Sequence, residues 1–171
     1  MTTAFESYGW LNLNNTRASI STAGWDIQLV GVDDPHIELD EYPLEVESES
    51  ANPVPSPTHQ RVKIGLTHAP YSHVLDQMAA EGCTAVFAGH THGGQVCVPG
   101  AGALVTNCDL DPQHASGLFQ WPLAGEGVLH GDGIVPTGTE PRPTSWVNVA
   151  AGIGASPAVP VRVACPPEAI V

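Results

Sequence analysis

The sequence has few basic residues: five Lys and Arg stand against 18 Asp and Glu, and the formal net charge of the 171-residue chain is −13. Lys and Arg are the residues that hold nucleic-acid phosphates, so this balance argues against a nucleic-acid-binding patch. An acidic protein that handles phosphate esters needs metal ions to reverse the local field. The charge thus argues against nucleic acid as a ligand, and it requires that a phosphate ester bind together with metal ions.

Paired cysteines and long apolar runs are missing too. The four cysteines form no CxxC pair and no compact zinc spacing, so we expect reduced thiols of a cytoplasmic protein: Cys83, Cys97, Cys108 and Cys165. The first residues lack a basic stretch followed by an apolar core and do not resemble a signal peptide. No run approaches the roughly 18 apolar residues of a transmembrane helix.

What remains is the composition of a folded domain. With 42% hydrophobic and 13% charged residues, the chain is long enough to bury a core, and residues 1–171 are predicted to form one domain. The 18 Gly and 16 Pro predict many loops. Two loop-rich segments stand out: the acidic, proline-rich residues 40–60, and residues 110–145, which show no sustained periodicity and are either a functional flap or poorly ordered.

Local patterns predict an α/β fold. Residues 18–32 have the apolar pattern of a two-stranded hairpin, and the two aspartates before Pro35 predict a turn. Residues 61–68 are β-rich, residues 71–82 have helical apolar spacing, and residues 83–89 form a nearly continuous apolar run. Further strands are predicted at residues 103–108, 146–154 and 159–165.

The strand–helix–strand unit brings three histidines to one place. Its two strands should be parallel, joined by a right-handed crossover, so both end at the same edge of the sheet. One strand brings His68 to that edge and the other brings His90 and His92, in the stretch "FAGHTHGGQ". In open α/β sheets, ligands bind at this carboxyl edge.

Imidazole is a good ligand for Zn, Fe, Mn and similar ions. In an extended segment, residues two apart point to the same side, so His90 and His92 can reach one ion or two neighbouring ions. The glycines that follow would let the backbone approach the ions and a bound oxyanion. This is the physical case for a site that holds two divalent metal ions.

"GHTHGGQ" after an apolar strand, with "LTHAP" one helix upstream, resembles the calcineurin-like metallophosphoesterases. "GVDDPH", "LVTNC" and "GIGASPAVPVRVACPPE" are similar to one bacterial branch of that superfamily. The resemblance implies mixed sheets packed face to face as a β-sandwich flanked by helices. It also implies cleavage of phosphomonoesters or phosphodiesters by a metal-bridging hydroxide, with His68 and His90 on the second metal and His92 on the first.

The chain departs from the family where the carboxylate ligands should be. The family motifs D-x-H, G-D-x-x-D and G-N-H-D or G-N-H-E do not occur in order before His68, and we interpret Asp34-Pro35-His36 as a turn. The chain therefore resembles a C-terminal half whose N-terminal half is missing, with Met1 as a candidate internal start. Unpaired strand edges would then favour self-association. We expect no catalysis from this half of a site alone.

The other polar candidates have plainer interpretations. Asp109 and Asp111 could replace missing carboxylates, but a turn cap before Pro112 is the better prediction. The remaining histidines are predicted non-ligands: His36, His59, His73, His114 and His130. Three hypotheses follow: a metal-dependent phosphoesterase with a phosphoester substrate, a noncatalytic truncated remnant, and a histidine-based metal-binding module.

Overall fold

The computed structural model describes residues 2–44, 59–122, 129–130, 133–134, 144–156 and 160–169. Its helical segments are α1 (Thr2–Glu6), η1 (Pro35–Ile37), α2 (Ser72–Ala80), η2 (His92–Gly94) and η3 (Pro112–His114). Its strands are β1 (Thr16–Thr22), β2 (Trp25–Gly31), β3 (Gln60–Leu66), β4 (Ala85–Ala88), β5 (Cys97–Val98), β6 (Gly102–Ala103), β7 (Gly117–Trp121), β8 (Leu129–His130), β9 (Gly133–Ile134) and β10 (Ser145–Val149).

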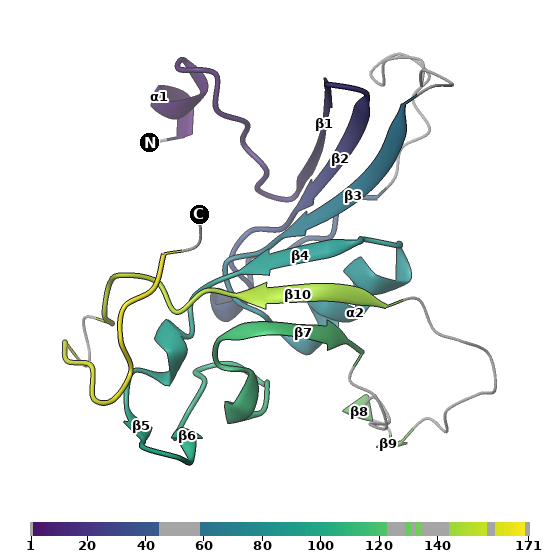
Figure 1. Ribbon diagram of the computed structural model, residues 1–171. Helices are drawn as coiled ribbons and strands as arrows, with labels where there is room; N and C mark the ends of the chain where they lie inside the picture. The colour runs from purple at the N-terminus through teal and green to yellow at the C-terminus, as the bar shows by residue number, and fades with distance from the viewer. Residues whose placement is uncertain are drawn as a thin grey trace.

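A mixed six-stranded sheet dominates the fold, in the order β1-β2-β3-β4-β10-β7 (Figure 1). The four central strands β2, β3, β4 and β10 are parallel, and β1 and β7 run antiparallel at the two edges. The α/β class is therefore confirmed, as are the hairpin and the β3–α2–β4 unit. The pairs β5–β6 and β8–β9 are short two-stranded ribbons, and the face-to-face sandwich stays a prediction.

The core lies between the sheet and α2, which packs behind the sheet in Figure 1. Helix α2 buries its apolar stripe completely at Val74, Leu75 and Met78. On the sheet side, one row of residues in register across β2, β4 and β10 supplies the matching surface: Val30, Val86 and Val147. Burial of this kind stabilises a fold by about 25 cal/mol per Å² of apolar area. Among the described helices, none has the length and apolar character of a membrane span.

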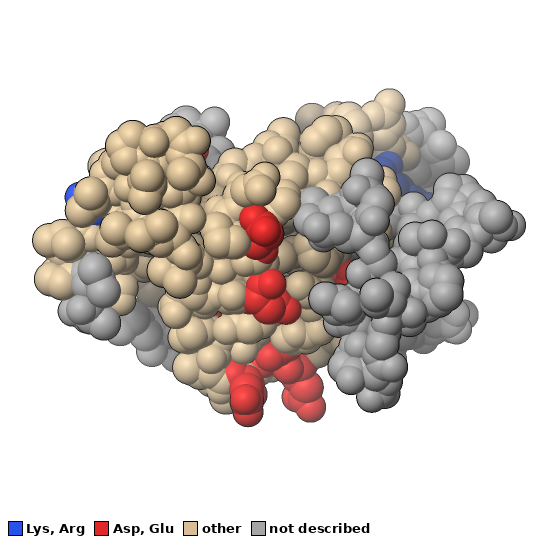
Figure 2. All heavy atoms as spheres, turned by 90° about the horizontal axis from the view of Figure 1, so that it is seen from below, with Lys and Arg blue, Asp and Glu red and all other residues tan. Residues whose placement is uncertain are grey.

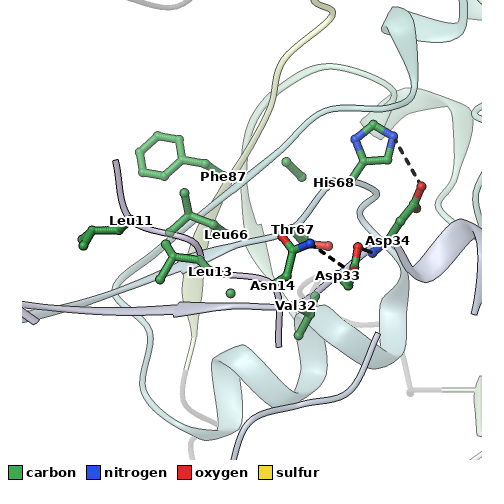
Figure 3. A pocket seen from close by; sticks show the side chains of 12 residues that line it. Leu11, Leu13, Asn14, Val32, Asp33, Asp34, Leu66, Thr67, His68 and Phe87 are labelled. Atoms are coloured by element: carbon green, nitrogen blue, oxygen red, sulfur yellow. Dashed lines mark hydrogen bonds and ion pairs between the residues drawn. The ribbon is translucent and has the colours of Figure 1, made fainter. Parts of the chain in front are cut away.

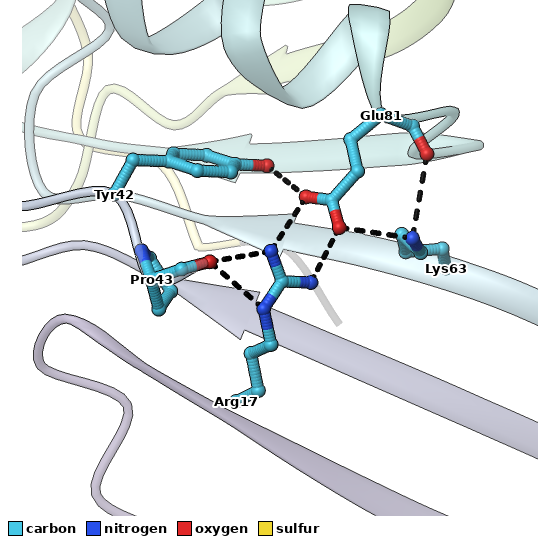
Figure 4. Close-up of polar contacts among 5 residues, drawn as sticks. All are labelled: Arg17, Tyr42, Pro43, Lys63 and Glu81. Carbon is cyan, nitrogen blue, oxygen red and sulfur yellow. Dashed lines mark hydrogen bonds and ion pairs between the residues drawn. The ribbon is translucent and has the colours of Figure 1, made fainter. Parts of the chain in front are cut away.

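A polar cluster closes the amino end of β4 (Figure 4). Glu81, directly after α2, accepts two hydrogen bonds from Arg17 of β1 at 2.5 and 2.9 Å and one from Lys63 of β3 at 3.1 Å. The Tyr42 hydroxyl also donates to it. Burial alone would raise the pKa of the Glu81 carboxyl, but these donors outweigh burial and lower it to about 2. The cluster ties the hairpin, β3 and α2 together.

Three strand predictions need correction. In the predicted segment 103–108 only Ala103 is strand, as the last residue of β6, because the Thr106 hydroxyl donates to the carbonyls of Cys108 and Leu110 instead of joining a ladder. In the predicted strand 159–165, the described residues pair only through the Val96–Val163 bridge. Strands β7, β8 and β9 lie inside residues 110–145, for which the sequence predicts only a loop-rich segment.

Candidate functional site

The site lies at the carboxyl edge of the parallel strands, and backbone pairing beyond the strand ends builds it. The Gly89 N–H donates to the His68 carbonyl at 2.9 Å, and the Thr67 N–H donates to the Phe87 carbonyl at 3.1 Å. The chain segments after β3 and β4 therefore leave the sheet side by side. This explains why residues 22 positions apart in the sequence meet at this edge.

Two of the three predicted ligands are in direct contact. His90 Nδ1 lies 3.0 Å from His68 Nε2, and the two rings meet edge to face with centroids 4.9 Å apart. Two nitrogens bound to one ion at about 2.1 Å each lie at most about 4.2 Å apart, so this pair fits a shared metal ion. The convergence predicted from the strand–helix–strand pattern is confirmed for these two residues.

The backbone at His92 differs from the predicted one. The prediction assumed an extended segment, but His90 has φ of 65°, Thr91 is in the right-handed helical region, and His92 has φ of 50° at the start of η2. The assumption that residues two apart share a side is therefore wrong here. The contacts described for His92 lie on its backbone, where its carbonyl accepts from Arg162 at 3.1 Å and from the Cys165 thiol at 3.3 Å.

The glycines after His92 have a packing reason in this structure. A Cβ on Gly93 would lie 2.8 Å from the Cys165 sulfur, and one on Gly94 would lie 2.4 Å from the Ala103 Cβ. Both residues also have positive φ, which other residues adopt at a cost. The turn is thus held against the C-terminal segment, where Arg162 also donates to the carbonyls of Ala151 and Gly152.

His36 joins the cluster, although the sequence predicted it to be a non-ligand. Its ring packs on His90 with centroids 4.3 Å apart, and its Nδ1 lies 3.0 Å from the Tyr71 hydroxyl oxygen. It arrives there because β2 is parallel to β3, so the turn after β2 ends at the same edge. No local sequence pattern predicts that pairing, so the sequence alone could not place His36 at this edge.

Asp34 is the carboxylate nearest to the pair. One of its oxygens accepts from the His36 N–H at 2.9 Å, as an N-cap of η1, and the other lies 3.9 Å from His68 Nε2. Asp111 accepts the Gln113 N–H as the N-cap of η3, which confirms the predicted turn cap before Pro112. Asp109 instead accepts the Ser72 N–H at the start of α2, so the predicted turn cap is wrong for this residue.

The surroundings of His90 disfavour its charged form. Burial lowers the pKa of its imidazole, and the neighbouring His36 and His68 lower it further. Its Nε2 lies 3.2 Å from the Asn107 carbonyl oxygen. The Asn107 side-chain amide nitrogen lies 3.1 Å from the same Nε2 and donates to it when the proton is on Nδ1. When Nε2 carries the proton it donates to the Asn107 carbonyl, and Nδ1 then presents a lone pair toward His68, which is the tautomer a metal ligand needs.

The ligand set is incomplete in the described part of the chain: no group of three or more His, Cys, Asp or Glu side chains is arranged there to hold a metal ion. The His68–His90 pair fits two ligand positions of one ion. The two-ion centre, with His92 as a further ligand, stays a prediction.

The remaining histidines that the structure describes have other partners. His73 is exposed on α2 and lies 2.6 Å from an Asp40 oxygen. His59 lies 3.0 Å from Asp26, and His114 packs edge to face on Phe119. The side chain of His130 lies outside the described residues. All four cysteines are free thiols.

Comparison with known proteins adds no relative: no family model, no curated protein and no solved structure matches this chain. The site must be interpreted from its own chemistry.

Proposed function

We propose that the carboxyl edge of the sheet binds a divalent metal ion and that the protein is a metal-dependent phosphoesterase acting on phosphomonoesters or phosphodiesters. The observation that carries this proposal is the 3.0 Å contact between His68 Nε2 and His90 Nδ1 at the edge where α/β proteins bind ligands. These two nitrogens would hold the ion. Asp34, 3.9 Å from His68 Nε2, would supply the carboxylate that the missing family motifs would otherwise provide, and on this ground we propose activity where the sequence alone predicts none.

A bound divalent ion would supply a Lewis acid for the phosphoryl oxygens and would lower the pKa of a coordinated water molecule. The protein's own residues have two further tasks in this proposal. Asn107 orients His90 through the contact at Nε2. His36, which packs on His90 and contacts Tyr71, is our candidate for protonating the departing oxygen.

The charge of the protein supports a metal-dependent site. Viewed from below, the surface carries a line of acidic side chains with basic ones at its margins (Figure 2). With Asp33 and Asp34 beside His68, a phosphate would meet negative charge unless a cation were bound.

Hydrolysis of p-nitrophenyl phosphate and bis-p-nitrophenyl phosphate tests the proposal, with Mn²⁺ or Zn²⁺ added after chelator treatment. His68→Ala and His90→Ala should each lower the metal-dependent rate by about 100-fold or more. His73→Ala is the matched control, because that histidine is exposed on α2, and it should leave the rate unchanged. A loss in His92→Ala equal to that in His90→Ala would support the predicted third ligand.

A metal-binding module without chemistry is the second candidate. The incomplete ligand set among the described residues favours it, because two nitrogens can hold an ion without assembling a reaction centre. Metal binding that depends on His68 and His90, with no hydrolysis of either ester, would support the module over the enzyme. Absence of metal binding would contradict both.

A further inference from the structure

An apolar groove leads away from the histidine edge across the exposed face of the sheet. Leu11, Leu13 and Asn14 form one wall, and the ends of β2, β3 and β4 form the floor and the other wall, around a volume of about 420 Å³. Figure 3 shows Leu11, Leu13, Leu66 and Phe87 at one end of it and His68 with Asp34 at the other. This is the size range in which proteins bind small organic ligands.

The wall formed by residues 11–14 is held in place by specific contacts. A Cβ on Gly31 would lie 2.4 Å from the Leu13 carbonyl oxygen, so the segment sits directly on the bare backbone of β2. The Asn14 amide donates to Asp33 at 3.1 Å, and the Asp33 N–H donates to the Asn15 side chain at 2.7 Å. These contacts fix residues 11–14 against the sheet, so the groove is a defined part of the folded structure.

The two ends of the groove differ in chemistry. At the apolar end, Leu11 is 52% exposed and Phe87 is 44% exposed, so both would gain from being covered. At the polar end, the His68 ring and the Asp34 carboxylate face each other at 3.9 Å. A ligand that follows the groove must have one polar end and one apolar end.

We propose that the groove binds the apolar ester group of the substrate, which makes the substrate class a phosphoester that carries an alkyl chain or an aromatic ring. This inference rests on the proposed function, because the phosphate is assigned to the metal-binding edge at His68. Leu66 and Phe87 contact the chain or ring, and Leu11 and Leu13 cover it from the other side.

The probe is octyl phosphate, compared with methyl phosphate, added to the full chain with Zn²⁺. The groove should bind octyl phosphate at least about tenfold more tightly than methyl phosphate, because the longer chain removes more apolar area from water. In NMR spectra the methyl signals of Leu11, Leu13 and Leu66 should shift with the octyl compound and not with the methyl compound. Phe87→Ser should abolish the tenfold preference.

The matched control is Leu118→Ser, because Leu118 is 64% exposed and lies in register with Phe87 on the same face of the sheet, outside the groove. It should keep the preference. Equal binding of the two phosphates, or equal effects of the two substitutions, would overturn the inference, and the wild-type methyl signals decide it if Phe87→Ser fails to fold.

Two further outcomes separate this inference from the proposed function. Shifts of the leucine methyl signals by octyl phosphate, without any ester hydrolysis, would support the groove and contradict the phosphoesterase. Tighter binding of octylammonium than of octyl phosphate in the presence of Zn²⁺ would overturn the inference, because the groove would then select a cationic head group.

Discussion

Two clusters of titratable side chains lie next to the two ends of β4, and their chemistry differs. At the amino end of β4, the Glu81 carboxylate is surrounded by donors from Arg17, Lys63 and Tyr42. At the carboxyl edge, three imidazoles pack on one another, and the His90 backbone has a positive φ. The first cluster balances charge and stabilises the fold, whereas the second gathers groups of the same kind.

The two clusters differ in the charge state that they favour and in the strain of their backbone. Surrounding donors lower the pKa of Glu81, so its charged form is favoured, whereas burial and neighbouring imidazoles lower the pKa of His90, so its charged form is disfavoured. Clusters that disfavour their own charge and carry backbone strain are typical of ligand sites. Substitutions in the Glu81 cluster should therefore lower stability, whereas substitutions in the histidine cluster should abolish metal binding.

The largest expected effect is on stability, from Glu81→Ala. Removing the carboxylate leaves Arg17 and Lys63 close together without their shared anion, so the free energy of unfolding should fall by about 2–3 kcal/mol. Urea denaturation measures this change. The control Glu41→Ala, at an exposed glutamate, should change it by less than about 0.5 kcal/mol. If Glu81→Ala and Glu41→Ala lowered the free energy of unfolding equally, the Glu81 cluster would have no special stabilising role.

The stabilisation from Glu81 should also depend on pH. The pKa of its carboxyl is about 2 in the fold and 4.5 as the ordinary value, so the unfolded chain binds more protons between these limits. The stability difference between wild type and Glu81→Gln should be full above about pH 5 and should shrink as the pH falls toward 2. A difference that stays constant from pH 6 to pH 3 in urea denaturation would contradict this role.

A smaller effect of opposite sign is expected from His90→Gly. Glycine adopts φ of 65° without the strain that histidine bears there, so stability should rise by up to about 1 kcal/mol while metal binding is lost. Glu38→Gly is the matched control, because Glu38 is exposed and has φ of 58°. It should give a similar gain in the thermal midpoint and keep metal binding. A clear loss of stability in His90→Gly would mean that the imidazole cluster supports the fold.

The sequence predicted the parts of the site that depend on local pattern. The β3–α2–β4 unit could be predicted because its helix is short and its strands are uninterrupted. The shared edge of those two strands was enough to predict that His68 and His90 meet. The position of His36 depends on the parallel pairing of β2 with β3, and no local pattern connects those strands. The backbone conformation of His92 was not predicted, because "GHTHGG" looks extended while positive φ angles turn the chain into η2.

Strand β7 shows the same limit in the fold. Its burial alternates along the strand, with Phe119 and Trp121 turned inward, but Leu118 is apolar and exposed. That one residue hides the alternation on which a strand prediction depends. Pairing with β10, far along the chain, decides its conformation.

Ring ¹⁵N chemical shifts during a Zn²⁺ titration show whether the ring nitrogens of His68 and His90 bind one metal ion. The signals of His68 Nε2 and His90 Nδ1 should change together and saturate at one ion per chain, while those of His59 and His73 stay in place. Unchanged shifts at both atoms, or changes confined to other histidines, would contradict this shared binding.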